Sequence, residues 1–443
     1  MQNGDSDGQP VVLQPKDAMG EMIQFVRKNS PFYGRAWKDV PADISNLEDL
    51  PVTNVDDYWQ ASNANEILTS SLTDGVVMRS GDSTGIPKLV YVTRSELKTI
   101  AQVKACAIAQ GCGLLPGDRI ANLSHHGSLY GSFMLLNTAI LELPVPIVHL
   151  PISGKESIEN MAQYMETFHA TVLLSNVSTT CRIADHFRTH NKTLPSIRLI
   201  LYSGESFHKS LRPVYRVAFP NAIICPVLYG SIDAGPIGIP AYSFRNEDDD
   251  INPVYKVLSP LLIMEIIAED GTVITTPGVK GNVVVTHLIK RQQPMLRYPC
   301  GDIAAWTDYH AGLFQLHGRS AVGLKISSTH LPLSFLKSLI ADVVTSECGI
   351  DISGFQTVAR RVAGSSTGQQ AVVFRIAATT NVPKDPETVR ERLEERLGRE
   401  SPSWGKNRRL GNLAPVGVEW VRSEDLVVNE GTGKLRDITE ERF

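Results

Sequence analysis

Short β-rich runs alternate with helical stretches between about residues 100 and 300. Most of the expected strands run directly into small or polar residues. This alternation is typical of an α/β domain, and open sheets of that class bind ligands where their strands end. The expected strands are Arg119 to Leu123, Val145 to Leu150, Ala170 to Ser175, Arg198 to Ser203 and Ile223 to Leu228, and the expected helices span 94–110, 155–168 and 206–217.

The pattern changes near residue 260. Leu261 to Ala268 alternates, reaches a Glu-Asp-Gly turn and resumes at Thr272 to Thr275, which predicts a β-hairpin. Val283 to His287 adds another strand. A largely antiparallel subdomain is therefore expected over about 260–318.

Beyond residue 320 the order of elements is strand, helix, strand, strand, helix, strand, which suggests a small α+β domain. The second helix has Asp385 as N-cap and Pro386 at its first position, with an apolar face at Val389, Leu393 and Leu397. We expect a large domain over 1–318 and a small mobile domain over 319–443. The expected elements of the small domain are strands over 322–326, 353–361, 370–378 and 416–421 and helices over 333–346 and 386–399.

Charge and hydropathy exclude several classes of protein. The net charge of −4 gives no electrostatic footprint for nucleic acid or an anionic membrane. The start of the chain is polar and acidic, unlike a secretory signal, and no apolar stretch reaches the roughly 18–20 residues that a membrane span needs. We expect a soluble, cytoplasmic protein, and the sequence leaves its oligomeric state open.

A loop rich in glycine and hydroxyl groups follows the apolar run Val76 to Met78. It extends from Ser80 to Lys88 and reads Ser-Gly-Asp-Ser-Thr-Gly-Ile-Pro-Lys. Such a loop can wrap backbone N–H groups, hydroxyls and one ammonium around a polyphosphate. It is not a Walker-type loop, because its lysine follows Ile-Pro. An ordinary surface loop is the alternative.

Two strand ends carry further candidate residues. The strand from Arg198 ends in Ser-Gly-Glu, so that a ligand could approach the backbone at Gly204, unless this is just a tight strand end. Tyr229, Gly230 and Asp233 follow the next strand. The tyrosine ring can stack on a purine and the carboxylate can hold a divalent cation, although a buried tyrosine over an ordinary turn has the same pattern.

Three later segments complete the set. Asp302 follows a tight turn at Cys300-Gly301 and is suited to accept both hydroxyls of a ribose, whereas a turn aspartate is the commoner role. Arg319 lies where the two domains join and could pair with a phosphate or be a surface residue. Lys434 follows Gly431-Thr432-Gly433 near the C-terminus, which suggests a mobile lysine. A simple flexible tail is the alternative.

In this order, the segments resemble the adenylate-forming superfamily of acyl-CoA synthetases, adenylation domains and luciferases. The phenylacetate-CoA ligase branch is the most similar, because Ser30-Pro31-Phe32-Tyr33 and Leu50-Pro51-Val52-Thr53 match its N-terminal motifs. The resemblance covers about residues 25–437. It implies an enzyme that joins a carboxylic acid to ATP, giving an acyl-adenylate and pyrophosphate, and then passes the acyl group to a thiol, usually that of coenzyme A.

The resemblance also implies a role for each matching residue. Lys434 would bridge the carboxylate and the α-phosphate, and neutralising that developing charge would supply most of the catalysis. Lys88 and Arg319 would contact phosphates or ribose. The remaining implied contacts are Ser83, Thr84 and Gly85 to phosphates, Gly204, Glu205, Tyr229 and Gly230 to adenine, Asp302 to ribose, Asp233 to Mg²⁺, and His125, His126, Tyr130 and Gly131 to the acid.

Departures from the family pattern keep other functions open. Asp82 lies within the phosphate loop, Ile232 replaces a hydroxyl residue, and Ala321 replaces the hinge aspartate. Ser327-Ser328 stands where relatives carry Arg-Gly, which favours adenylation over transfer to coenzyme A. The alternatives are transfer to an amine or a carrier-protein thiol, and a non-catalytic nucleotide- or acyl-binding protein. An aryl or arylalkyl acid is expected from the branch alone.

Overall fold

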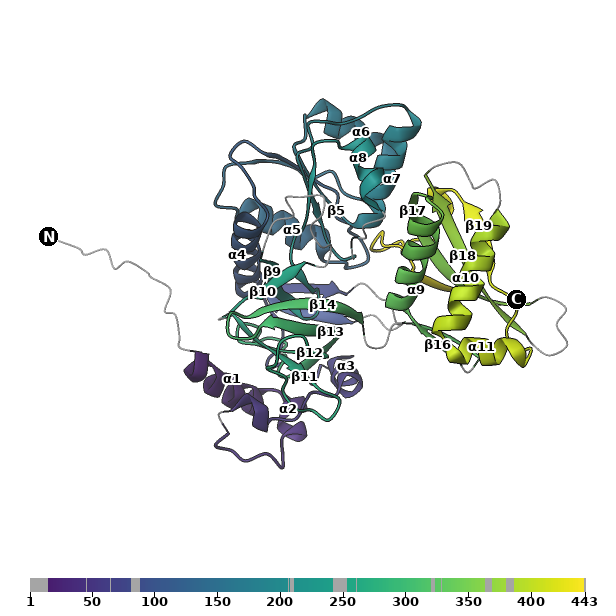
Figure 1. The fold of residues 1–443 in the computed structure, drawn as a ribbon. Coiled ribbons are helices and arrows are strands. Elements are labelled where there is room, and N and C mark those ends of the chain that lie inside the picture. The colour runs from purple at the N-terminus through teal and green to yellow at the C-terminus, as the bar shows by residue number, and fades with distance from the viewer. Residues whose placement is uncertain are drawn as a thin grey trace.

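The computed structural model describes residues 15–44, 46–63, 65–80, 88–205, 207, 211–241, 253–259, 261–319, 323–327, 329–362, 369–379 and 386–441. Figure 1 shows a parallel sheet at one end, an antiparallel sheet beside it, the N-terminal helices below, and the C-terminal elements to one side. Asp82, Ser83, Thr84, Gly85, Ala321, Ser328 and Asp385 lie outside the described residues.

The expected α/β region is a five-stranded parallel sheet in the order β4-β3-β5-β6-β7. Its inner strands β5 and β6 are buried on both faces. Leu173 and Ile200 pack among helices on one face, whereas Leu174 and Leu201 pack with Ile108 of α4 on the other. The elements are α4 (Arg94–Gly111), β3 (Arg119–Asn122), α5 (Ser132–Leu141), β4 (Val148–Leu150), α6 (Ile158–Thr167), β5 (Val172–Ser175), α7 (Val177–Thr189), β6 (Leu199–Tyr202), α8 (Arg212–Ala218) and β7 (Ile223–Pro226).

A seven-stranded antiparallel sheet has the order β11-β12-β13-β14-β10-β9-β8. It reaches back to Tyr229, so the antiparallel region begins earlier than predicted, because short glycine- and proline-rich strands showed no alternation. The predicted hairpin is present only at its tip. Val273 forms an antiparallel bridge with Ile267, and the Ile274 N–H donates to the Ile266 carbonyl at 2.7 Å, whereas β11 pairs along its length with the fully buried valines of β12. The strands are β8 (Tyr229–Ser231), β9 (Gly235–Pro240), β10 (Val254–Val257), β11 (Leu262–Ile267), β12 (Lys280–His287), β13 (Tyr298–Asp308) and β14 (Leu313–Arg319).

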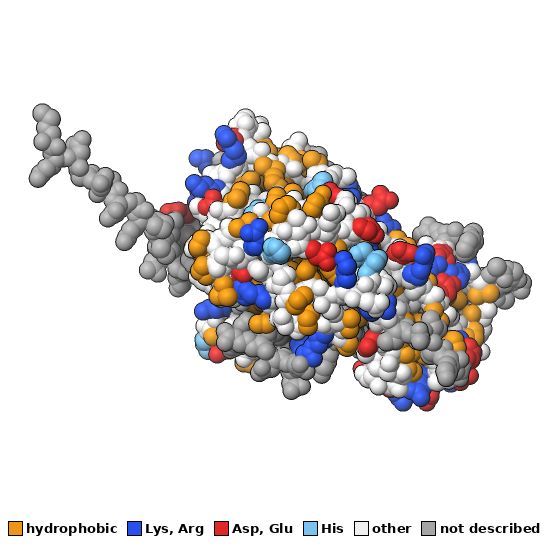
Figure 2. Space-filling view, turned by 90° about the horizontal axis from the view of Figure 1, so that it is seen from above, with side chains coloured by type: hydrophobic (Ala, Val, Ile, Leu, Met, Phe, Trp, Pro, Cys, Tyr) orange, Lys and Arg blue, Asp and Glu red, His pale blue; other side chains and the backbone are white. Residues whose placement is uncertain are grey.

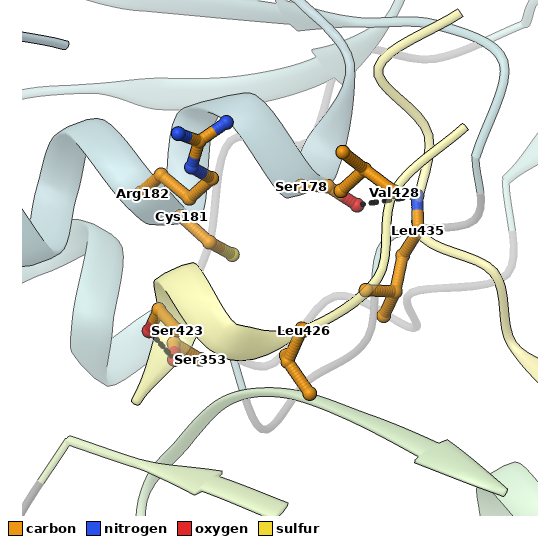
Figure 3. A pocket seen from close by; sticks show the side chains of 8 residues that line it. All are labelled: Ser178, Cys181, Arg182, Ser353, Ser423, Leu426, Val428 and Leu435. Carbon is orange, nitrogen blue, oxygen red and sulfur yellow. Dashed lines mark hydrogen bonds between the residues drawn. The ribbon is translucent and has the colours of Figure 1, made fainter. Parts of the chain in front are cut away.

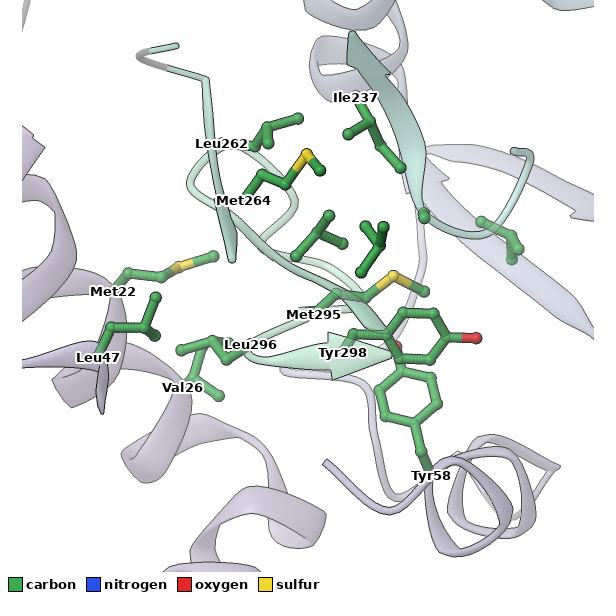
Figure 4. Packing of buried hydrophobic residues seen from close by; sticks show 14 of the residues in the cluster. Met22, Val26, Leu47, Tyr58, Ile237, Leu262, Met264, Met295, Leu296 and Tyr298 are labelled. Carbon is green, nitrogen blue, oxygen red and sulfur yellow. The ribbon is translucent and has the colours of Figure 1, made fainter. Parts of the chain in front are cut away.

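The N-terminal helices α1 (Pro15–Asn29), α2 (Pro31–Ala36) and α3 (Val55–Asn63) pack against this sheet. Figure 4 shows Met22 and Val26 of α1 and Tyr58 of α3 beside the segment from Met295 to Tyr298. The N-terminal motifs fix that segment. The hydroxyls of Tyr33 and Thr53 donate to the carbonyls of Pro294 and Leu296. A hairpin of β1 (Gly75–Arg79) and β2 (Leu89–Thr93) brackets the glycine-rich loop.

The C-terminal sheet has the order β19-β18-β17-β20 and is covered on one face by helices. The predicted helix over 386–399 is confirmed as α10 (Pro386–Glu400), which buries Val389, Leu393 and Leu397. The strand expected over 322–326 pairs with β16 in a separate hairpin, and the helix expected over 333–346 becomes a π-helix at 341. The other elements are β15 (Gly323–Ile326), β16 (Thr329–Pro332), α9 (Leu333–Ile340), β17 (Ile352–Arg361), β18 (Gln370–Ala378), α11 (Pro402–Arg409), β19 (Gly417–Val421) and β20 (Ile438–Glu441).

The surface carries mixed charge. On the face shown in Figure 2, acidic and basic side chains are interspersed. Within the described part of the chain, no helix is both long and apolar enough to cross a membrane. The division of the chain at residue 318 and the mobility of its C-terminal part stay predictions.

Candidate active site

The strand ends of the parallel sheet meet a loop from the C-terminus of the chain. Asn176, which follows β5, donates from its side-chain amide to the carbonyl of Thr432 at 3.2 Å. Lys155 donates to the carbonyl of Glu430. The C-terminal loop 429–435 therefore lies against the edge at which ligands bind open sheets.

A small pocket marks the boundary between α7 and the C-terminal elements (Figure 3). Helix α7 forms one wall, and the start of β17, η4 (Ser423–Asp425) and the segment from 426 to 435 form the others. The lining residues are Ser178, Cys181, Arg182, Ser353, Ser423, Leu426, Val428 and Leu435.

The side chain of Lys434 lies against the backbone of Gly204. A Cβ built on Gly204 would lie 2.6 Å from Lys434 Cε and 2.8 Å from its Nζ. Gly204 also has a φ of +74°, a conformation that favours glycine. The sequence predicted that a ligand could approach this backbone, which stays a prediction, and in the structure the side chain of Lys434 lies against it.

The carboxylate of Glu205 lies between α7 and the C-terminal loop. It accepts hydrogen bonds from the Ser178 backbone N–H at 2.8 Å, the Ser178 hydroxyl at 2.7 Å and the Leu435 N–H at 2.8 Å. These three donors fill most of the acceptor sites of the carboxylate and leave the Glu205 backbone as the more accessible group for a contact with adenine.

His125 is buried and packs between two backbone segments. Its ring lies against Gly154 and against Gly433, the residue before Lys434. Burial, and then the charges of Lys155 and Arg182, lower the His125 pKa to about 4. The ring is therefore neutral at pH 7.

The other residues expected around the acid lie nearer the glycine-rich loop. His126 is exposed and its ring contacts Phe133 at a centroid distance of 5.4 Å. Tyr130 forms a bridge with Arg79 at the end of β1, and Gly131 packs on Met78. This segment therefore runs beside Ser80, where the glycine-rich loop begins.

The lysine that closes the glycine-rich loop forms an ion pair with Asp233. Lys88 Nζ lies 3.5 Å from Asp233 Oδ2, 3.4 Å from the Tyr298 hydroxyl and 5.3 Å from the centre of the Trp59 ring. The Tyr298 hydroxyl donates to Asp233 at 3.0 Å and accepts from the Trp59 indole N–H at 3.1 Å. Burial alone would raise the Asp233 pKa, but Lys88, Ser231 and Tyr298 together lower it, so the carboxylate is ionised at pH 7.

Two residues that were not predicted from the sequence hold the backbone at Asp233. Lys290 donates to the carbonyl of Asp233, and His287 Nε2 contacts the carbonyl of Ala234. Burial lowers the Lys290 pKa to about 8. No local pattern identifies such residues, because a buried lysine has the same sequence signature as an exposed one. Trp59 was missed for a similar reason: nothing near it in the sequence connects it to Lys88.

Tyr229, Asp302 and Arg319 form a second polar cluster. The Tyr229 hydroxyl donates to Asp302 Oδ2 at 2.8 Å, and Arg319 Nε lies 3.1 Å from Asp302 Oδ1. Tyr229 packs against Tyr255 and Phe314 at centroid distances of 5.9 and 5.7 Å. The sequence predicted that Asp302 follows a tight turn. In the structure it lies within the long strand β13 instead. A bulge there places it opposite Arg319, with Gly301 at a φ of +77°.

Among the described residues, no group of three or more His, Cys, Asp or Glu side chains could hold a metal ion. Mg²⁺ usually keeps several waters and binds through one or two carboxylates and substrate phosphates. A single acid such as Asp233 fits that mode of binding.

No protein-family model matches the chain. The sequence is 24% identical over 307 residues to the phenylacetate-coenzyme A ligase of Thermus thermophilus, a match that covers 66% of this chain and 65% of that relative. The match thus spans slightly less than two thirds of the relative.

Solved structures with the same fold cover almost the whole chain. A 2-hydroxyisobutyryl-CoA ligase in the postadenylation state, in complex with 2-HIB-AMP, has a TM-score of 0.72 at 17% identity, covering 97% of this chain and 89% of that one. The same ligase in the thioesterification state has a TM-score of 0.61. The acyl acid amido synthetase GH3.15 has a TM-score of 0.68 at 14% identity, covering 92% and 86%. The chain therefore has the fold of these ligases and synthetases, which is the fold that its sequence motifs predicted.

Proposed function

We propose that this protein is an ATP-dependent carboxylic acid ligase that forms an acyl-adenylate. The observation that carries the proposal is the position of Lys434 against Gly204, at the strand ends of the parallel sheet. A catalytic cation is needed there because the reaction brings a carboxylate up to a triphosphate, and both are anionic. The higher TM-score against the postadenylation state than against the thioesterification state supports the same arrangement.

In the proposed reaction a carboxylate oxygen attacks the α-phosphorus of ATP, and pyrophosphate leaves. Lys434 would bind one oxygen of each reactant and offset their repulsion. Lys88 would contact the β- and γ-phosphates, together with Ser83, Thr84 and Gly85 of the glycine-rich loop. Mg²⁺ beside Asp233 would neutralise phosphate charge, and this requires the Lys88–Asp233 pair to loosen when ATP binds.

The nucleoside would lie along the second polar cluster. Asp302 is oriented by Tyr229 and Arg319, which supports a role in accepting the ribose hydroxyls. Tyr229 and Gly230 would border adenine with the backbone of Gly204 and Glu205. His125, His126, Tyr130 and Gly131 would border the acid. A neutral His125 can donate to a carboxylate without competing for the charge of Lys434.

Coenzyme A is the proposed acceptor, and an amine or a carrier-protein thiol is the second candidate. The residues of the turn between β15 and β16 are the reason for keeping both candidate acceptors. Ser327, at a φ of +51°, stands where relatives carry arginine, and its N–H donates to the Gln370 side chain at 2.8 Å. The turn therefore offers no cation at that position to a phosphorylated acceptor. Product analysis with coenzyme A, hydroxylamine and amines separates these candidates.

Carboxylate-dependent exchange between ATP and labelled pyrophosphate tests the adenylation step. We expect exchange with at least one member of a panel of aryl, arylalkyl and alkyl acids. ATP binding by calorimetry without exchange across the panel would favour the third candidate, a non-catalytic nucleotide- or acyl-binding protein.

A further inference from the structure

The C-terminal loop is a compact turn that supports itself. The Asn429 side chain accepts from the N–H groups of Gly431 and Thr432 at 3.0 and 3.1 Å, and the Asn429 carbonyl accepts from Gly433 at 2.7 Å. The Asn429 N–H in turn donates to the carbonyl of Lys434 at 2.8 Å. Because the turn is closed by its own hydrogen bonds, fixing one end of it fixes the position of Lys434.

Glu205 is anchored independently of that loop. Of the three donors that the described residues supply to its carboxylate, two belong to Ser178, in the first turn of α7, whose N-cap is Asn176. An anion is stabilised at a helix N-terminus by the free N–H groups and the helix dipole. The carboxylate is therefore held by α7 without the loop. The N–H of Leu435, directly after Lys434, donates to Glu205 at 2.8 Å and more weakly to the Ser178 hydroxyl at 3.3 Å.

We propose that Glu205 is a positioning residue that docks the C-terminal loop through the Leu435 amide and so places the Lys434 ammonium over Gly204. This inference rests on the proposed function for its consequence in catalysis, but not for the docking itself. It gives Glu205 a role other than the adenine contact that the family resemblance implied.

Tryptic cleavage after Lys434 measures docking without any enzymatic activity, because the docked lysine lies against Gly204. The cleavage rate is followed by mass spectrometry relative to the Lys192–Thr193 bond, in a loop exposed in the same protein. The donors from Ser178 and Leu435 share two carboxylate oxygens in the wild type, whereas Glu205→Gln leaves them one acceptor oxygen. We expect relative cleavage after Lys434 to rise roughly ten-fold, the effect of losing one charge-assisted hydrogen bond.

Matched variants separate docking from a general loss of structure. Asp185→Asn removes a carboxylate on the same helix that pairs with Arg188 and not with the loop, and should leave the cleavage ratio unchanged. Ser178→Ala keeps the Leu435 donor on Glu205 and should give a smaller rise. Glu205→Asp, which keeps the charge, should recover part of the protection.

Activity provides the second measurement. Glu205→Gln should lower kcat for pyrophosphate exchange and leave the KM for ATP nearly unchanged. Unchanged cleavage after Lys434 in Glu205→Gln would overturn the inference. If no acid supports exchange but the cleavage ratio still rises, the docking role holds and the proposed function is the part that fails.

Discussion

Lys434 occupies the space that a side chain on residue 204 would fill. The contact joins the C-terminal loop to the end of β6, and a Cβ on residue 204 would require the end of the Lys434 side chain to move. Through that contact the C-terminal loop delivers the positive charge on which the proposed acyl-adenylate formation depends.

Removing the Lys434 ammonium should separate binding from chemistry. Lys434→Ala is expected to lower pyrophosphate exchange by roughly two to three orders of magnitude, the usual effect of losing a preorganised electrostatic contact in the transition state. ATP affinity measured by calorimetry should change little, because Lys88 and Asp302 remain. Equal losses of exchange and of ATP binding would show that Lys434 has another role.

A methyl group at position 204 should displace the Lys434 side chain and strain the backbone. Gly204→Ala meets a positive φ, which costs about 1 kcal/mol, and it also displaces Lys434. Gly271→Ala is the matched control, with a φ of +87° and open space around the added Cβ. Both variants should lose similar stability in urea unfolding, and Gly204→Ala alone should lose exchange. Full exchange in Gly204→Ala would refute the contact.

The buried imidazole of His125 predicts a loss of stability in acid. Burial lowers its pKa to about 4 in the folded protein, whereas the unfolded chain titrates near the usual value of about 6.5. As the pH falls below about 6.5 the unfolded chain binds the proton first. The stabilisation from neutral His125 is thus complete above that pH and is lost between about 6.5 and 4.

The variant His125→Gln should flatten this dependence. We expect urea unfolding at pH 7.5, 6.0 and 5.0 to show a slope that is shallower than that of the wild type by up to about 1.4 kcal/mol per pH unit. His287, whose pKa burial lowers to about 3, is present in both proteins and cancels. Parallel slopes would mean that His125 is not buried as described.

Trp59 should affect ATP binding from outside the predicted motifs. Trp59→Phe removes the indole donor to Tyr298 and weakens the aromatic contact with Lys88. A loss of about 1 kcal/mol corresponds to a roughly five-fold weaker ATP affinity. Trp420→Phe serves as control, because the buried Trp420 indole nitrogen has no hydrogen-bond partner among the described residues. Equal ATP affinities in the two variants would contradict the role of Trp59.

The elements that the sequence predicts well are those with a strong local signal. Strands such as Leu199–Tyr202 are apolar at every position because both faces of the sheet are covered, and α10 repeats its buried leucines every four residues. Short strands such as β8 and β20 carry no such pattern. They form because longer neighbours offer unpaired edges, and that information lies elsewhere in the chain.

The candidate site shows the same division. The order of the motifs predicts that Lys434 and Gly204 belong to one site, and the two residues are in contact. The contact partners of Glu205 and Trp59, in contrast, depend on tertiary packing. Glu205 bonds to Ser178 and Leu435, and Trp59 reaches Tyr298 from an N-terminal helix. The residues in each of these contacts are far apart in the sequence, and no local motif spacing links them.

Pyrophosphate exchange in wild type and Lys434→Ala, over one panel of carboxylic acids, is the decisive measurement for the role of Lys434 in adenylation. We predict exchange that requires both an acid and ATP, and its near-complete loss in the variant while ATP still binds. Wild-type protein that binds ATP yet gives no exchange with any acid, or a Lys434→Ala variant that exchanges at the wild-type rate, would contradict that role.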